Sequence, residues 1–363
     1  MKLTRRAFAL SCAAMALAGT ALAQDVPAGY PADYAATVEA AKSQGKVVIY
    51  TSTDIAQAQA LLDAFSAKYG IAVEYNDLGT NGAYNRAISE AAASQMGADI
   101  VWSSAMDLQM TLAADGYAES YASPEKSALP EWAVHQDQLY ATTVEPIGAI
   151  YNTGAIKPEA FPKTRAELIA YLNDHQGELK GKVATFDPEK SGTGFLHHTN
   201  DLVATDSFWD LAKALGGVGV RTYSSSGSMK ETVVSGENVM AINIIGSYAL
   251  DWVKQSPNLA VAFGTDYTAA FSRLALLTKS APHPEAGKLF LDFMLSREGQ
   301  SALAKGGLPS VRGDVTEGLN IDSLNDLVGG SLKPIAVDDH LLKFMSPQER
   351  VGFFREWNAA LGK

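Results

Sequence analysis

The chain has 363 residues, a formal charge of −11, and 19% charged against 47% hydrophobic residues. This acidic balance disfavours nucleic acid and anionic lipid surfaces as partners, although a local site can still bind an anion. The length is sufficient for two hydrophobic cores of ordinary size.

The first 23 residues have the pattern of an export signal. Three basic residues precede an apolar run, 7–18, that is too short to span a bilayer. Residues 21–23, Ala-Leu-Ala, then offer a small-x-small cleavage site. We therefore expect a signal peptide at 1–23 and a periplasmic mature chain, exported by the general secretory or the twin-arginine route.

The only cysteine of the chain, Cys12, lies in this segment. A mature chain that starts near Gln24 would therefore have no disulfides, no thiol nucleophile and no cysteine-ligated metal. Its stability must come from packing.

Strands and helices are predicted to alternate in the first part of the mature chain. Short apolar runs at 46–50, 71–75 and 98–102 predict strands. Between them, apolar residues recur at helical spacing in segments that begin near Asp54 and in the loop 79–82. Strands separated by helices in this way form right-handed crossovers and a parallel sheet.

Ligands of such sheets bind beyond the carboxyl ends of the strands, near helix N-termini. Small polar residues follow each of the three predicted strands, and they are Thr51, Ser52 and Thr53; Gly79 to Gly82, which include Thr80; and Ser103 with Ser104. Loops after strands are often polar without any ligand, so each residue has both interpretations.

Two long extended runs predict passages between two lobes. The run 139–152 separates the first group of elements from a second group, whose first helix starts at a capping box of Thr164 and Glu167. The run 267–277 is predicted to cross back. Between them, a continuous apolar strand at 239–245 leads through Gly246, Ser247 and Tyr248 into a helix.

The stretch 181–198 contains a pattern that indicates anion binding. A short apolar strand ends at Asp187, and a loop of four small residues then leads into a helix: Ser191, Gly192, Thr193 and Gly194. Free backbone N–H groups at such a helix start can bind an anion. The same four residues also make an ordinary strand-to-helix turn.

The main catalytic patterns are missing from the sequence. There is no Gly-x-Ser-x-Gly elbow, no phosphate-binding loop with its lysine, no His-Glu-x-x-His pair and no complete dinucleotide fingerprint. These missing motifs weigh against an enzyme, although absence of a motif does not prove absence of activity.

The ordered motifs resemble those of the family 1 extracellular solute-binding proteins of ABC importers. They comprise the segments 47–52, 98–102 and 145–152, Gly236-Glu237 before 240–242, and 281–286 through 290–300. The similarity is to the cluster that holds ferric-iron, sugar-phosphate and aminoalkylphosphonate binders, and it covers nearly the whole mature chain.

This resemblance implies an α/β type II periplasmic binding fold, with two α/β lobes joined by two hinge strands and a ligand held in the cleft. The implied lobes are 24–144 with 267–310 and 145–266 with 311–363. The implied hinges lie near Thr143 to Pro146 and Asp266 to Thr268. Lobe closure around the solute would present one surface to the permease.

Ferric-binding members of this family carry two adjacent tyrosines as iron ligands. The corresponding place here is Ser247-Tyr248, so Tyr248 alone would have to hold the metal. His197 and His198 point about 100° apart on a helix and do not face one site, so packed or surface imidazoles are expected.

A phosphorylated or phosphonate anion suits the sequence better, because hydroxyl and backbone donors need no lysine. Glu145 and Asp187 are candidates for an amine or hydroxyl of the solute, with a hinge or capping role as the alternative. Arg86, Arg221 and Arg273 are candidate charge partners, with solvated or salt-bridged arginines as the commoner case.

The expected function is that of a monomeric periplasmic binding protein that delivers a small anionic solute to ABC permease subunits, without a cofactor or bound metal. The alternatives are a ferric-iron carrier and a periplasmic ligand receptor for a membrane sensor. The expected ligand-binding residues are Thr51, Ser52, Thr53, Thr80, Ser103, Glu145, Ser191, Gly192, Thr193, Gly194, Ser247 and Tyr248.

Overall fold

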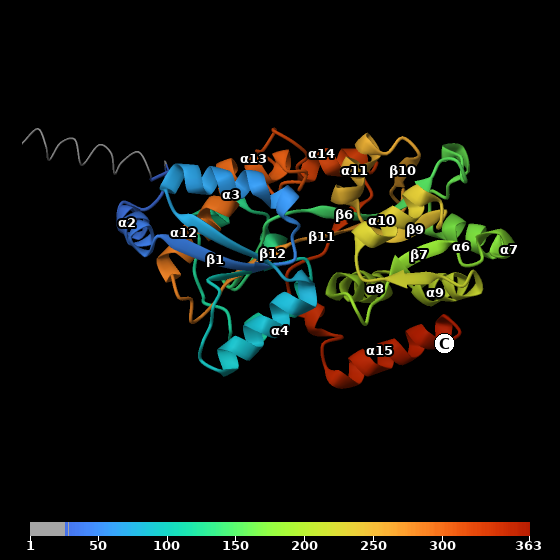
Figure 1. Ribbon diagram of the computed structural model, residues 1–363, viewed down its shortest axis with the longest axis horizontal. Coiled ribbons are helices and arrows are strands. Elements are labelled where there is room, and N and C mark those ends of the chain that lie inside the picture. Colours follow the sequence, from blue (N-terminus) through green and yellow to red (C-terminus); the bar gives the residue numbers. More distant parts are fainter. Residues whose placement is uncertain (1–25, 28) are drawn as a thin grey trace, which may run out of the picture.

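The computed structural model describes residues 26, 27 and 29–363, so the expected signal peptide lies outside the described residues. Two α/β lobes lie side by side along the long axis of the molecule (Figure 1). Within the described chain the strands form two sheets, in the orders β2-β1-β3-β12-β5-β4 and β13-β11-β6-β9-β7-β8, with β10 also paired to β6. The expected two-lobe α/β class is confirmed.

The first lobe is built around a parallel unit. Strand β1 pairs in parallel with both β2 and β3, as the predicted crossovers require. The strands of this lobe are β1 (Lys46–Thr51), β2 (Ala72–Asp77), β3 (Ile100–Ser103), β4 (Val134–His135), β5 (Leu139–Ala141) and β12 (Leu274–Leu277). Its helices are α2 (Tyr34–Gln44), α3 (Ile55–Tyr69), α4 (Gly79–Ala92), α5 (Met106–Ala114), α12 (Pro284–Leu295) and α13 (Arg297–Lys305), with short 3₁₀ turns η1 (Pro124–Ala128) and η2 (Glu131–Ala133).

The second lobe repeats this plan with other connections. Strand β7 pairs in parallel with β8 and β9, and β6 runs antiparallel to β9, β10 and β11. Its strands are β6 (Glu145–Asn152), β7 (Val183–Phe186), β8 (Arg221–Tyr223), β9 (Met240–Ile245), β10 (Leu259–Ala262), β11 (Thr268–Phe271) and β13 (Leu332–Pro334). Its helices are α6 (Arg165–Asp174), α7 (Gln176–Leu179), α8 (Gly192–Ala204), α9 (Phe208–Gly217), α10 (Ser226–Ser235) and α11 (Gly246–Gln255), with a 3₁₀ turn η3 (Pro158–Ala160).

The local signals account for much of this order. The capping box of Thr164 and Glu167 is present at the start of α6. Helix α3 buries the apolar stripe of Leu61, Phe65 and Tyr69 against the sheet of the first lobe, as its spacing predicts. Burying such a stripe stabilises the lobe by about 1.5 to 3 kcal/mol for each large side chain.

The chain passes from lobe to lobe where the predicted extended runs lie. The first run divides into β5 and β6, so the passage is at 142–144. The second divides into β11 and β12, so the passage is at Ser272 and Arg273. The expected second hinge near Asp266 to Thr268 is therefore wrong by several residues, because β11 still pairs with β6 and β13 of the second lobe.

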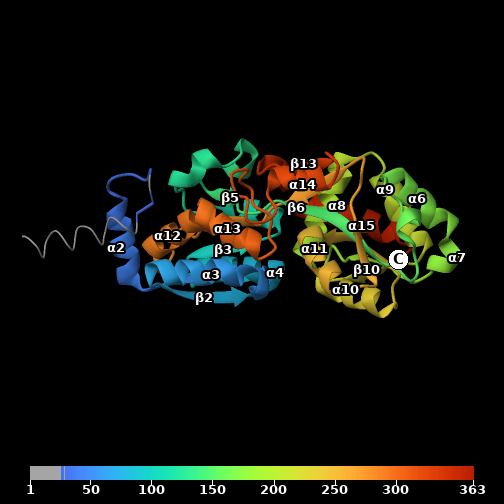
Figure 2. The same ribbon diagram turned by 90° about the horizontal axis from the view of Figure 1, so that it is seen from above.

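The C-terminal part makes a further passage that the sequence did not indicate. After α14 (Ile321–Leu327) and β13, the segment that leads to η4 (Asp339–Leu342) packs Ile335, Val337 and Leu341 into the core of the first lobe. Helix α15 (Pro347–Ala360) then packs on α9 of the second lobe. Figure 2 shows α14 and β13 over the junction of the lobes. The expected assignment of all of 311–363 to the second lobe is therefore too simple.

In the part of the chain that the structure describes, no helix is long and apolar enough to cross a membrane.

Candidate ligand-binding site

The loops that follow the parallel strands of the two lobes meet across the junction. In the first lobe these loops follow β1, β2 and β3, and in the second they follow β7 and β9. The N-termini of α5 and α8 therefore approach each other. This is the edge at which α/β sheets bind ligands.

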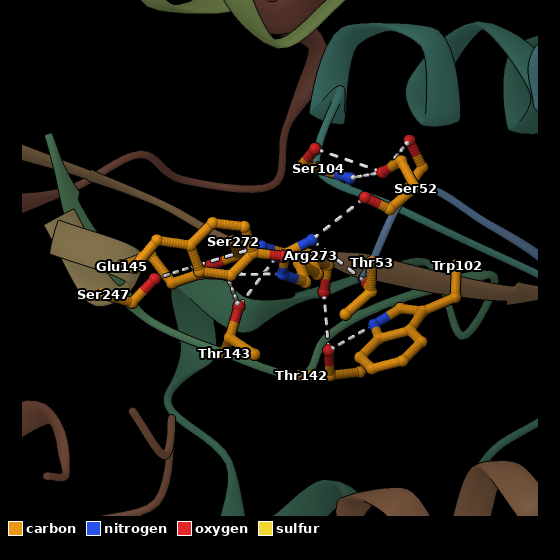
Figure 3. Close-up of polar contacts among 12 residues, drawn as sticks. Ser52, Thr53, Trp102, Ser104, Thr142, Thr143, Glu145, Ser247, Ser272 and Arg273 are labelled. Atoms are coloured by element: carbon orange, nitrogen blue, oxygen red, sulfur yellow. Dashed lines mark hydrogen bonds and ion pairs between the residues drawn. The ribbon is translucent and has the colours of Figure 1, made fainter. Parts of the chain in front are cut away.

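A cluster of hydroxyl groups lies on the first-lobe side. Ser52 Oγ is 3.2 Å from Ser104 Oγ and accepts a hydrogen bond of 3.1 Å from the Ser104 N–H (Figure 3). Ser52 Oγ also donates to Ser103 Oγ at 3.4 Å, and Thr51 Oγ1 accepts from the Thr53 N–H at 3.0 Å. Ser52 and Ser103 thus belong to one polar group, whereas the Thr51 hydroxyl stabilises the turn in which Thr51 itself lies.

Two contacts join this side to the second lobe. Ser104 Oγ and Thr193 Oγ1 are 2.8 Å apart, and the Gly192 N–H donates to Thr80 Oγ1 at 3.1 Å. An added Cβ on Gly192 would lie 3.0 Å from Leu108 Cδ1 and 3.1 Å from Ala105 Cβ. The lobes therefore touch at the first turn of α8, and glycine there permits the close approach.

The other members of the 191–194 loop already have partners within the second lobe. Ser191 Oγ caps α8 by accepting the Gly194 N–H at 3.1 Å. An added Cβ on Gly194 would lie 2.6 Å from Phe186 Cβ, so this glycine is required by packing. Gly192 and Thr193 are thus the positions of this loop that contact the first lobe, and the role of the loop as an anion cradle stays a prediction. Asp187 accepts N–H groups of its own turn and pairs with Lys190.

Glu145 and Arg273 form an ion pair at the two hinge passages. Arg273 Nε donates to Glu145 Oε1 at 2.8 Å and Nη2 donates to Oε2 at 3.2 Å, and both side chains are 0% exposed (Figure 3). Thr143 and Ser247 donate their hydroxyls to the same carboxylate. The side chains of Glu145 and Ser247 thus form hydrogen bonds within the hinge in this structure.

The guanidinium also reaches the first lobe. Its Nη1 donates to Thr53 Oγ1 at 3.0 Å. Burial would lower the pKa of Arg273, but Glu145 more than offsets this and the pKa is raised above its ordinary value. Arg273 was one of three candidate arginines; Arg86 and Arg221 are exposed and pair with neighbouring glutamates.

Tyr248 packs beside this pair. Its hydroxyl accepts the Asp54 N–H at 3.3 Å, and the guanidinium carbon of Arg273 lies 5.2 Å from its ring centroid. Burial raises the pKa of Tyr248 to about 12, so the side chain is a neutral phenol at physiological pH.

The two adjacent histidines are packed imidazoles, as expected. His197 Nδ1 lies 3.0 Å from the Asn243 carbonyl oxygen and His198 Nε2 lies 3.2 Å from that of Phe186. Both are fully buried, and burial lowers the pKa of His197 to about 3 and that of His198 to about 4. Among the described residues no group of three or more His, Cys, Asp and Glu side chains could hold a metal ion.

Two residues outside the list of expected ligand-binding residues lie at the lobe junction. Ser104 makes the hydroxyl contact to Thr193, and Asp107 is buried in the first turn of α5. Ser104 follows β3 as Ser103 does, so its position was a usable signal. Asp107 looks like an ordinary first-turn acid in the sequence, and only burial distinguishes it.

Comparison with known proteins agrees with this two-lobe arrangement. A crystal structure of the substrate-binding protein of an ABC transporter from Agrobacterium tumefaciens is similar at 36% identity and a TM-score of 0.82, covering 87% of this chain and 94% of that one. The periplasmic binding protein AfuA from Actinobacillus pleuropneumoniae, solved with fructose-6-phosphate, superposes with a TM-score of 0.70 at 22% identity, covering 88% and 99% of the two chains.

A sequence relative and a family pattern complete the comparison. The putative 2-aminoethylphosphonate-binding periplasmic protein of Salmonella typhimurium is 25% identical over 269 residues, which are 71% of this chain and 75% of the relative. The pattern of one family, described as bacterial extracellular solute-binding protein, matches residues 60–323. The chain therefore belongs to the family of bacterial extracellular solute-binding proteins.

Proposed function

We propose that this protein is the periplasmic component of an ABC importer and that it captures a small phosphorylated or phosphonate organic anion between its lobes. The observation that carries the proposal is the meeting of hydroxyl groups and a helix N-terminus across the lobe junction, through Thr80 and Ser104 on one side and Gly192 and Thr193 on the other. Lobe closure then delivers the loaded protein to the permease subunits.

The chemistry of these groups favours a phosphorus oxyanion. Hydroxyls and backbone N–H groups donate to several oxygens at once, and the N-terminus of α8 adds a favourable dipole. In the complex, Ser104 and Thr80 would exchange their contacts to the second lobe for contacts to solute oxygens. Arg273 is already neutralised by Glu145, so the oxyanion is held without a free cation at the hinge.

A ferric-iron carrier is less well supported. Iron(III) requires several anionic oxygens, and Tyr248 is held as a phenol beside a guanidinium. Ser247 stands in the neighbouring position and donates to Glu145. The relatives in Salmonella and Actinobacillus, whose names specify a phosphonate and a sugar phosphate, add weight to the phosphorus ligand.

Thermal-shift screening of the purified, processed protein tests the proposal. The panel contains ethylphosphonate, 2-aminoethylphosphonate, glycerol 3-phosphate, fructose 6-phosphate, inorganic phosphate and ferric citrate. A solute at a thousandfold excess over its Kd stabilises the folded protein by about 4 kcal/mol, which corresponds to roughly 6 °C for a chain of this length. Stabilisation by ferric citrate alone would overturn the proposal.

A receptor for a membrane sensor would bind the same solute. Membrane vesicles that contain the cognate permease and ATPase separate the two roles, because an importer component supports ATP-dependent uptake of the radiolabelled solute. Failure to stimulate uptake, with solute binding intact, would favour the sensor role.

A further inference from the structure

Asp107 is a buried carboxylic acid that is incompletely hydrogen-bonded. It is the second residue of α5 and only 2% exposed. Its Oδ1 accepts the Leu108 N–H at 2.8 Å, whereas Oδ2 has no hydrogen-bond partner within the described chain. A buried polar atom without a partner typically costs about 1 to 3 kcal/mol, so such atoms require an explanation.

The position of Asp107 places it at the lobe junction. Ala105, two residues before it, and Leu108, the residue after it, both lie close to Gly192 of the second lobe. Ser104, three residues earlier, makes the hydroxyl contact to Thr193. Asp107 therefore belongs to the same turn as the proposed oxyanion donors, and it is supplied by the opposite lobe from α8.

Burial and one charge of the second lobe act on this carboxyl. Burial, the dominant cause, raises the pKa of Asp107 to about 7, and Arg350 on α15 of the second lobe partly opposes the rise. Asp107 in turn contributes to the raised pKa of Tyr84 on α4. Figure 1 shows α4 and α15 on the same side of the molecule, flanking the junction.

Arg350 does not donate a hydrogen bond to the free carboxyl oxygen of Asp107. Its guanidinium carbon stacks on the rings of Phe195 at 4.2 Å and Phe354 at 5.3 Å, and no ion pair joins it to Asp107 among the described residues. The free oxygen accepts only, once the carboxyl is ionised, so the missing partner is a hydrogen-bond donor. A cationic donor suits this oxygen best, because a positive charge favours the ionised form of the Asp107 carboxyl and offsets the cost of burying it.

We propose that Asp107 receives the ammonium group of the solute, which is a short zwitterion with its phosphonate or phosphate at Ser104 and Thr193. The inference rests on the proposed function and adds the residue that binds the ammonium end of the solute. Ser104 and Asp107 lie three residues apart at the start of α5, so the proposed solute is a short one. Bare phosphate esters and phosphonates of the same length bind more weakly, because they leave Oδ2 without a donor.

Two matched pairs of solutes test this assignment by titration calorimetry: ethylphosphonate with 2-aminoethylphosphonate, and ethyl phosphate with O-phosphoethanolamine. We expect the wild-type protein to bind each amine at least tenfold more tightly than its partner. Asp107→Asn should remove this preference and retain binding of the amine-free solutes. Asp115→Asn, at the exposed end of the same helix, is the control and should retain the preference.

A second readout needs no variant. Because Asp107 must ionise to hold an ammonium, the preference for the amine should increase from pH 5.5 to pH 8, and the amine should release more protons at pH 6 than its partner does. Titration in buffers of different ionisation heat measures this release, and comparison within a pair subtracts the titration of the phosphonate itself. Equal affinity for both members of each pair refutes the role of Asp107 while leaving the proposed function intact. Failure of every phosphorus compound to bind refutes the proposed function instead.

Discussion

Replacing Gly192 with valine should weaken solute binding without unfolding the protein. Gly192 is the first residue of α8, and its backbone has no left-handed conformation that would exclude a side chain. The three atoms nearest to an added Cβ belong to the first lobe, at 3.0 Å for Leu108 Cδ1 and Thr80 Oγ1 and 3.1 Å for Ala105 Cβ. The clash therefore exists only when the lobes are together.

The size of the effect follows from these distances. A single Cβ already sits closer than ordinary van der Waals contact, and the two methyl groups of valine extend further toward the first lobe. Overpacking of this kind costs about 1 to 3 kcal/mol, which corresponds to a loss of roughly 5-fold to 150-fold in affinity when it acts on the closed form alone.

Titration calorimetry measures the affinity, and thermal melting of the solute-free protein reports the fold. Gly227→Val is a matched control, because Gly227 lies in the first turn of α10 with no other atom within 4 Å of an added Cβ. We expect this control to bind normally. Unchanged affinity in Gly192→Val would show that lobe contact at this turn is not part of solute capture.

Three further variants test individual contacts. Gly194→Ala should lower stability by about 1 to 3 kcal/mol in chemical unfolding, because its Cβ would lie 2.6 Å from Phe186 Cβ inside one lobe; a melting temperature equal to wild type would contradict this. Glu145→Gln should cost about 3 to 5 kcal/mol by leaving Arg273 buried without its partner, and the double change with Arg273→Met should recover part of the loss, as a double-mutant cycle can measure. The pKa of His198 is about 4 in the folded protein, below its unfolded value of about 6.5. The neutral imidazole therefore contributes to the free energy of unfolding above pH 6.5, and this contribution, roughly 3 kcal/mol, is lost as the pH falls toward 4. His198→Gln should flatten the stability profile measured by urea unfolding from pH 7 to pH 4.5, and an identical slope would refute the assignment.

Local patterns predict the framework of this fold well. The apolar run around Ile49 and the capping box at Thr164 depend on residues close in sequence, and both appear as expected. The two lobe passages also follow from extended runs. Their exact positions do not, since β11 and β12 are both apolar and only pairing shows that the chain changes sheets at Ser272 and Arg273.

The candidate site is predicted less completely, because its contacts are long-range. Glu145 and Arg273 are separated by 128 residues, and nothing in either local sequence marks them as partners. Ser191 caps its own helix by accepting the Gly194 N–H, and its role as an anion donor stays a prediction. Asp107 looks like an ordinary first-turn acid in the sequence, and only the fold shows that it is buried. Burial by a distant segment is therefore the property that local pattern reasoning lacks here.

The central claim is that a small phosphorus oxyanion is captured where the lobes meet, and one titration tests it most directly. Wild-type protein and Gly192→Val are titrated side by side with the phosphonate or phosphate ester that gives the largest thermal shift. We predict saturable binding of one solute per wild-type chain and a clearly weaker affinity in the variant. Binding of equal strength in both proteins, or no binding of any phosphorus compound while ferric iron binds, would contradict the claim.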